Sequence, residues 1–443
     1  MNKIRLYAIG GYSEIGRNMT AIQYNSSIII IDMGIHLPSV IKYKKEFEDL
    51  TKKEMQELGA IPDDSILEPF KDQVKAILIG HAHLDHCAAI PYLASKYNCP
   101  IYATPYTIEV IKKILKDKEI KIKNSLRAIS PNQKIKITKN ITAEFIHMTH
   151  SIPQTAMISI KTPKGIILYA NDFKFDNSPV LGKPPNYEKL KKLKDKVLLL
   201  IIDSLYADTP GKTPSEKVAR ELLKDVLLGT NNKGHAVLIT TFSSHIARLK
   251  SILEFGLKLR RKVVFLGRSL NKYINAAEKI NLVNFSRKAE VIGYRSKIRR
   301  KLKQIEKHGR SSYLIVCTGH QGEPDAVLAK IVNGIYKFKL YPGDHVIFSS
   351  SIIPNKENIE QRKKLDNKLK SLGIRIFTNV HSSGHAYRED LRDLIKIIKP
   401  KIIIPAHADL PKLKAFVELA QEEGYKKGKN ILIIKEHQII DLK

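Results

Sequence analysis

VKAILIGHAHLDH, residues 74–86, is the stretch that decides the fold class. An apolar run typical of a buried strand leads directly into three histidines and an aspartate. His81 and His83 are two residues apart at a strand end, so both imidazoles leave the same face and can reach one metal ion. Asp85 and His86 follow on a loop and can turn to a second ion. Imidazole with carboxylate suits zinc, so the pattern predicts a two-zinc site and leaves manganese open.

Short apolar strands joined by turns surround this stretch. Glycine and asparagine pairs such as Gly10-Gly11 mark the turns. A charged segment at 42–58 is helix-like. The predicted strands are 4–9, 20–24, 27–32, 74–80, 101–103, 135–137, 141–147, 155–161, 165–170 and 197–203.

The pattern changes after about Asp208, where Pro210, Gly211 and Pro214 form a breaker-rich junction. Strands then alternate with helices, which predicts a parallel sheet with helices on its faces. Its strands are 236–240, 262–266, 313–317 and 345–349, and its helices are 244–259, 270–280, 324–332 and 358–372. Loops at the carboxyl ends of such strands, here 241–244, 267–269 and 317–323, suit phosphates, although the same residues also serve as helix caps.

From Arg375 the first pattern returns. A strand at 374–380 precedes HSSGHA, and a helix at 388–398, a strand at 401–405 and a closing strand follow. The chain is therefore expected to be discontinuous, with the middle part inserted into the first.

Charge favours a polyanionic partner. Lys and Arg number 76 against 44 acidic residues, a formal net charge of +32. A lysine-rich genome bias is the simpler alternative. The odd count of 3 cysteines without a signal sequence favours a reducing cytoplasm, and no apolar run is long enough to span a bilayer, so no membrane role is expected.

Further motifs make a family resemblance specific. HAHLDH resembles the second motif of the metallo-β-lactamase superfamily, and the other motifs follow in order. They are Asp32, His150 and Asp172, then Asp203, His385 and His407, which match motifs A, B and C of the nucleic-acid-processing β-CASP branch. GGYSEIGRN (10–18), NDFKFD (171–176), TGHQGEP (318–324) and HSSGHA (381–386) closely resemble the RNase J family, and the chain length resembles its archaeal form.

The resemblance implies an α/β protein with an αββα metallo-β-lactamase sandwich and an inserted α/β β-CASP domain. The sandwich would comprise 1–208 and 376–443, and the inserted domain 209–375. RNA would enter between them. PAHAD and NDF replace the commoner PVHGE and GDF, but neither change removes a ligand.

The resemblance also implies roles for the site residues. One zinc would bind His81, His83 and His150, the other would bind Asp85, His86 and His407, and Asp172 would bridge them. Asp32 and Asp203 would orient ligands, and His385 would face the scissile phosphate. Catalysis would rest on His385, Asp85 and Asp203, with water activated by the metals as nucleophile.

A pocket for a 5′-monophosphate is expected in two loops. Its candidates are Ser243, Ser244, His381, Ser382, Ser383, Gly384 and His385. Helix capping remains the alternative for Ser243 and Ser244, and packing remains the alternative for His381.

The implied function is a zinc-dependent 5′→3′ exoribonuclease acting on 5′-monophosphorylated RNA in RNA decay and in maturation such as rRNA processing. Endonuclease action is left open. The implied partner is single-stranded RNA, and a homodimer is left open. The first alternative is another β-CASP nuclease, either an mRNA 3′-end-type endonuclease or a DNA-processing enzyme. The other two are a small-molecule hydrolase of the superfamily, such as a thioesterase or lactonase, and a catalytically inactive RNA-binding scaffold. The basic run 287–310 is either an RNA track or a solvated helix face.

Overall fold

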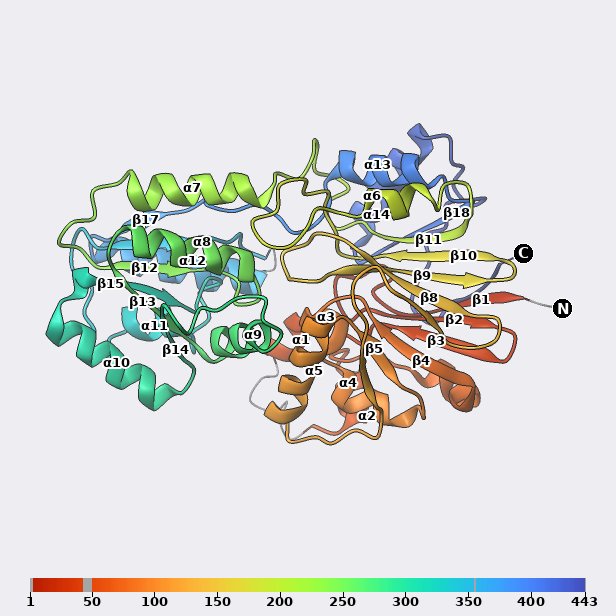
Figure 1. Cartoon of the computed structure of the whole chain (residues 1–443), viewed down its shortest axis with the longest axis horizontal. Coiled ribbons are helices and arrows are strands. Elements are labelled where there is room, and N and C mark those ends of the chain that lie inside the picture. The colour runs from red at the N-terminus through yellow and green to blue at the C-terminus, as the bar shows by residue number, and fades with distance from the viewer. Residues whose placement is uncertain (1–2, 43–49, 354–355, 443) are drawn as a thin grey trace. The chain divides into compact units, whose positions relative to one another are not determined.

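The chain leaves one folded unit and later returns to it (Figure 1). The computed structural model describes residues 3–42, 50–353 and 356–442. Unit 1 comprises Met1–Asn177, Lys183–Thr213 and Gly384–Lys443, and unit 2 comprises Ser178–Gly182 and Pro214–Ser383. The domain boundaries expected from the sequence, after residues 208 and 375, stay a prediction.

Two sheets packed face to face form the centre of unit 1. Apolar side chains from both sheets, such as Ile29, Leu78, Phe145 and Ile201, fill the space between them. The first sheet has the order β19-β1-β2-β3-β4-β5-β6, with β1 Ile4–Gly10, β2 Met19–Tyr24, β3 Ser27–Ile31, β4 Val74–Ile79, β5 Ile101–Ala103, β6 Leu126–Ala128 and β19 Ile439–Leu442. The second has the order β18-β11-β10-β9-β8-β7, with β7 Lys134–Lys136, β8 Thr142–His147, β9 Ala156–Thr162, β10 Gly165–Ala170, β11 Val197–Asp203 and β18 Ile402–Ala406.

Helices cover the outer faces of this sandwich. Leu394 of α13 and Phe416 of α14 pack against the second sheet, and Figure 1 shows α4 and α5 outside the first. The helices are α1 Leu37–Lys42, α2 Lys52–Glu57, α3 Leu84–Cys87, α4 Ile90–Leu93, α5 Pro105–Asp117, α6 Tyr187–Lys191, α13 Arg388–Ile398 and α14 Leu410–Glu422, with 3₁₀ turns at Ser65–Gln73 and Ala94–Lys96. The layers confirm the predicted αββα class. Of the helix-like segment 42–58, residues 43–49 lie outside the described residues, and α2 confirms a helix in the rest.

Unit 2 is built on one parallel sheet, as the alternating pattern predicted. Its order is β14-β13-β15-β12-β16-β17, with β12 Val237–Thr240, β13 Lys262–Leu266, β14 Glu290–Ile292, β15 Tyr313–Cys317, β16 His345–Phe348 and β17 Arg375–Phe377. Around it lie α7 Glu216–Leu228, α8 Ile246–Lys258, α9 Arg268–Lys279, α10 Arg295–His308, α11 Val327–Val332 and α12 Lys356–Ser371, with a 3₁₀ turn at Arg310–Ser312.

The two faces of this sheet carry different helices. Ile298 of α10, Leu328 of α11 and Leu365 of α12 pack into one apolar cluster with Leu238 of β12. A Cβ on Gly256 of α8 would lie 2.5 Å from Val263, whose side chain points to the opposite face. None of the helices in the described residues is both long enough and apolar enough to cross a membrane.

Parallel pairing in unit 1 gathers strand ends at one edge. β3 runs parallel to β4, and β11 runs parallel to both β10 and β18. Asp32 follows β3, His81 comes two residues after β4, Asp172 two after β10, and His407 follows β18, while Asp203 is the last residue of β11. Histidines and aspartates from distant parts of the sequence therefore lie close together at this edge.

Candidate metal centre and phosphate loops

Seven side chains at this edge form two groups of metal-ligating atoms. His81, His83, His150 and Asp172 make one group, and Asp85, His86 and His407 make the other, each with ligand atoms within 4.8 Å of one another. All seven were nominated from the sequence, and the structure places them together. β4 ends at Ile79, so His81 and His83 lie on the following loop rather than on the strand itself.

The two carboxylate oxygens of Asp172 face different groups. Oδ2 lies 3.2 Å from His81 Nε2 and 3.4 Å from His150 Nε2. Oδ1 lies 3.2 Å from His86 Nε2 and 3.8 Å from His407 Nε2. Asp85 Oδ2 completes the second group at 3.8 Å from both of these histidines. Asp172 thus presents one carboxylate oxygen to each group.

Outer partners fix the direction of the ligand rings. His86 Nδ1 donates to Asp32 Oδ2 at 2.7 Å, which leaves Nε2 directed at the cluster. Asp32 is itself held by the Tyr169 hydroxyl at 3.0 Å and by the Gly80 N–H at 2.9 Å. This is the arrangement by which proteins orient metal-ligating histidines.

Gly384 orients the His150 ring, as Asp32 orients the His86 ring. Its carbonyl accepts a hydrogen bond from His150 Nδ1 at 2.6 Å. A Cβ on residue 384 would lie 2.8 Å from the same ring and 2.7 Å from Ser151 Oγ, closer than real Cβ contacts allow. Residue 384 was nominated for phosphate binding, but its observed contact is with a candidate ligand.

His385 lies beside these two groups and forms a third candidate group with Asp172 and His407. Its Nδ1 donates to Asp203 Oδ2 at 2.7 Å, and its Nε2 lies 3.8 Å from Asp172 Oδ2. Burial opposes a charged ring here, but the carboxylates of Asp203 and Asp172 outweigh it and raise the pKa of His385 to about 9.

Two asparagines complete the centre and were missed as functional residues. Asn18 Oδ1 lies 3.1 Å from His407 Nδ1, and its Nδ2 donates to the main-chain oxygen of Asp85 at 3.1 Å. Asn171 Nδ2 donates to Asn18 Oδ1 at 3.1 Å and to the Tyr169 hydroxyl at 2.9 Å. The segments GGYSEIGRN and NDFKFD carry both, but their role depends on contacts that the local sequence does not reveal.

The donor set fits a bound metal. Burial and the neighbouring His86 ring lower the pKa of His81 to about 4, so at neutral pH its imidazole offers a lone pair. Among the described residues, Asp172 Oδ1 is buried yet accepts no hydrogen bond. Buried, unsatisfied carboxylate oxygens are costly unless a cation occupies the site. Nitrogen donors with a few carboxylate oxygens suit zinc.

Three residues of the centre also have left-handed backbone conformations. Asp32, Asp172 and His407 have φ angles of 61°, 37° and 56°, the left-handed region that residues other than glycine rarely adopt. Such conformations cost free energy and persist where the surrounding structure enforces them, commonly at functional sites.

Unit 2 holds the serine loops nominated for phosphate. The N-cap of α8 is His245, whose side chain accepts from the Arg248 N–H, so neither Ser243 nor Ser244 is the capping residue. Ser243 Oγ lies 2.8 Å from Ser269 Oγ, which joins two of the candidate loops. Ser382 is buried and its hydroxyl donates to the Pro214 carbonyl, so it holds the loop in place.

A buried ion pair anchors the loop that begins at Val380. Arg248 is fully buried and donates through Nε and Nη2 to Glu216 at 2.6 and 2.8 Å. Its Nη1 donates to the carbonyls of Ser349 at 2.9 Å and Val380 at 3.0 Å. His381, Ser382 and Ser383 follow directly, so this pair sets where their loop starts.

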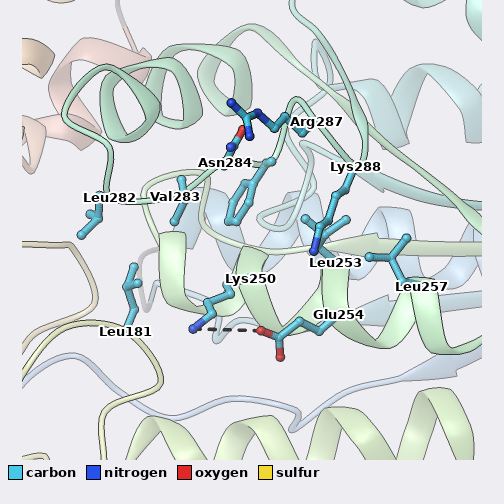
Figure 2. A pocket seen from close by; sticks show the side chains of 11 residues that line it. Leu181, Lys250, Leu253, Glu254, Leu257, Leu282, Val283, Asn284, Arg287 and Lys288 are labelled. Atoms are coloured by element: carbon cyan, nitrogen blue, oxygen red, sulfur yellow. Dashed lines mark ion pairs between the residues drawn. The ribbon is translucent and has the colours of Figure 1, made fainter.

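A separate pocket of about 400 Å³ lies over α8 (Figure 2). Its apolar wall includes Leu181, Leu253 and Phe285, and Lys250, Arg287 and Lys288 also line it. None of the predicted metal ligands or phosphate-loop residues lines this pocket, whereas Arg287 and Lys288 belong to the basic run 287–310.

Family models cover most of the described fold. Residues 60–207 match the beta-lactamase superfamily domain, 234–366 match "Ribonuclease J, beta-CASP domain", and 372–433 match "Zn-dependent metallo-hydrolase RNA specificity domain". A crystal structure of a protein of unknown function from Enterococcus faecalis shares the fold, with a TM-score of 0.65 at 18% identity over 99% of this chain and 100% of that one.

Fold, cluster and family models together define a metal-dependent ribonuclease class with metallo-β-lactamase and β-CASP parts. Ribonuclease J of Methanocaldococcus jannaschii is 44% identical over 99% of this chain and 98% of its own length. Ribonuclease J of Pyrococcus abyssi is 40% identical, covering 100% and 98%, and ribonuclease J 1 of Streptococcus pyogenes is 33% identical, covering 100% and 75%. The chain belongs to the ribonuclease J family.

Proposed function

We propose that this chain is a two-zinc ribonuclease that degrades RNA from a 5′-monophosphate end in the 5′→3′ direction. The observation that carries the proposal is Asp172, whose two oxygens face separate sets of histidines. Asp172 would bridge the ions, with His81, His83 and His150 on one side and Asp85, His86 and His407 on the other. Bound zinc supplies Lewis acidity towards the phosphate and lowers the pKa of water at the site. Manganese is the alternative ion.

The chain's own residues would supply orientation and proton handling. Asp32 holds His86, and Gly384 holds His150, each through the ring nitrogen that does not face the cluster. Asp203 holds His385 in the same way, so Nε2 is directed towards the cluster. His385 is placed to donate a hydrogen bond to a phosphate oxygen or a proton to the leaving 3′-oxygen. Because water is the nucleophile, the products carry a 5′-phosphate and a 3′-hydroxyl.

Recognition of the 5′ end is assigned to the serine loops. Ser243, Ser244, His381 and Ser383 offer hydroxyl, imidazole and main-chain N–H groups that suit a phosphate. Since the Ser382 hydroxyl is engaged with Pro214, only its main-chain N–H is offered. Such a pocket suits a 5′-monophosphate better than a 5′-triphosphate, which carries more charge.

Digestion of RNA labelled at its 5′ phosphate tests direction and chemistry together. The expected result is release of labelled mononucleotide, slower attack on a 5′-triphosphate end, and no cleavage after chelation. Internal cuts alone would contradict the exonuclease and support the 3′-end-type endonuclease. Equal rates on both ends would contradict the pocket.

Variants test the ligand assignment. Asp85→Ala and His86→Ala should each lose cleavage and one of the two proposed zinc ions. Both variants should keep most of the affinity for RNA, because phosphate-backbone binding does not depend on one ligand. His437→Ala is the matched control, since the His437 side chain is exposed and lies 3.7 Å from Asp63, away from the candidate ligands. Full activity in either ligand variant would overturn the assignment.

A further inference from the structure

We propose that α10 of unit 2 is a docking surface for single-stranded RNA, separate from the serine loops. This inference rests on the proposed function, because it assumes an RNA substrate. The helix, RSKIRRKLKQIEKH, carries seven Lys or Arg residues and a single acidic one, Glu306.

Packing forces the cationic side of α10 towards solvent. Ile298, Leu302 and Ile305 are buried in the apolar cluster beneath the sheet. Arg295, Arg299, Lys303 and Lys307 are exposed, and we call these four residues the cationic stripe. They recur every four residues, so they advance along one side of the helix in steps of about 6 Å. The same packing buries the apolar side, so the helix has no face left to insert into a lipid surface.

The stripe has no acidic partner among the described residues. None of its four members forms an ion pair within the described residues, and like charges spaced four apart destabilise a helix. Glu306, the one acid, accepts from the main-chain N–H of Lys339 at 3.1 Å. Elsewhere in unit 2 the signs are mixed, as in α7, where Lys224 pairs with Glu221 at 2.8 Å. A polyanion is the partner that would relieve this repulsion.

An exposed aromatic ring begins the stripe. Tyr294, the N-cap residue of α10, is 71% exposed. The ammonium of Lys297 lies 5.6 Å from its ring centroid. A ring of this kind next to a row of cations is the combination that binds single strands, since bases stack on the ring while phosphates meet the cations.

The test compares two charge reversals of equal size. Arg299→Glu/Lys303→Glu alters the stripe, and Lys363→Glu/Lys364→Glu alters two exposed lysines of α12 in the same unit. Affinity for a long single-stranded RNA is measured in chelator across a salt series. The stripe variant should bind more weakly, and the slope of log K against log salt should fall by about 1.4, at about 0.7 per lost contact on single strands. The α12 variant should keep the wild-type slope.

Three further readouts separate this proposal from others. Tyr294→Ala should weaken binding at high salt, where charge is screened, and Tyr294→Phe should restore it. DNA of the same sequence should respond in parallel, because the contacts are to backbone and ring faces. Cleavage of RNA by the wild-type chain is measured alongside, so that failure of the proposed nuclease would show as absent wild-type cleavage, whereas failure of the docking surface would show in the binding series alone. If the two charge reversals changed RNA affinity equally, or if neither changed it, the proposal would be overturned. The cationic stripe would then be a candidate surface for an acidic protein partner.

Discussion

Gly384 shows how the lack of one side chain can place a histidine. Its carbonyl takes the Nδ1 proton of His150, and its Cα sits where any Cβ would meet that ring. We predict that Gly384→Ala displaces His150 and lowers zinc content and the cleavage rate by about 10–100-fold, as loss of such supporting contacts does. Bound zinc and single-turnover cleavage are the measurements.

Gly424→Ala is the control for that substitution. Gly424 has a φ of 88° and open space around it, so alanine there costs stability through backbone strain alone. Its zinc content should stay at the wild-type level. An active, zinc-replete Gly384→Ala would show that His150 tolerates the displacement.

The site residues that could be predicted from the sequence are those that form a motif of neighbouring residues. The spacing of His81, His83, Asp85 and His86 is itself a chemical pattern, so it can be recognised before any fold is known. Asn18 is different, because a lone asparagine before a strand has no distinctive chemistry until the fold brings it to His407. The hydroxyl of Ser382 also looked available in the sequence, yet it is used by the Pro214 carbonyl.

At the element scale, the loop before β2 contacts the segment before β19. Glu14 from the loop and Glu436 from the segment lie close together there. Arg17 pairs with Glu14 at 2.8 Å and with Glu436 at 2.7 Å. Burial, and then the neighbouring Glu14 carboxylate, raise the pKa of Glu436 from 4.5 to about 8. Between these pH values the folded chain keeps a proton that the unfolded chain has lost. The contribution of Glu436 to the free energy of unfolding therefore falls as pH rises from 4.5 to about 8.

We predict that Glu436→Gln flattens this pH dependence, because an amide keeps a hydrogen-bond donor towards Glu14 without titrating. Urea unfolding at a series of pH values measures it. Glu418→Gln, on the exposed side of α14, should leave the wild-type curve unchanged. If the free energy of unfolding depended on pH identically in the wild type and in Glu436→Gln, a group other than Glu436 would hold the proton that the folded chain keeps.

The bounds of helices and strands with a strong apolar pattern were predicted well. Elements with a weaker apolar pattern were not predicted well from the sequence. The strands Gly165–Ala170 and Val197–Asp203 and the helix Arg388–Ile398 have the predicted bounds. β6 is a three-residue strand with two exposed positions, so pairing with β5, rather than its own composition, defines it. The predicted strand 374–380 ends at Phe377, and the following residues are drawn into the loop that Arg248 holds at Val380.

At the scale of the whole molecule, bound metal should stabilise unit 1 as well as support cleavage. Seven candidate ligands, from the first and the last of the three chain segments of unit 1, converge there. A ligand that binds only the folded state adds about 2.7 kcal/mol at a hundredfold excess over its Kd. We predict that a chelator lowers the melting temperature, measured by calorimetry. His407→Ala, which removes a ligand of one of the two proposed ions, should show a smaller decrease in melting temperature on chelation than the wild type. A wild-type melting curve that the chelator leaves unaltered would contradict zinc binding.

The return of the chain to unit 1 also has a consequence during protein synthesis. β18 takes its place beside β11, and His407 reaches the cluster, only after all of unit 2 has been made. A nascent chain that has emerged as far as Ser383 has neither His385 nor His407, and the first sheet still lacks β19 at its edge. With the proposed roles of His385 and His407, a copy still attached to the ribosome before these residues are made would lack cleavage activity, so an unfinished chain would not cleave its own message.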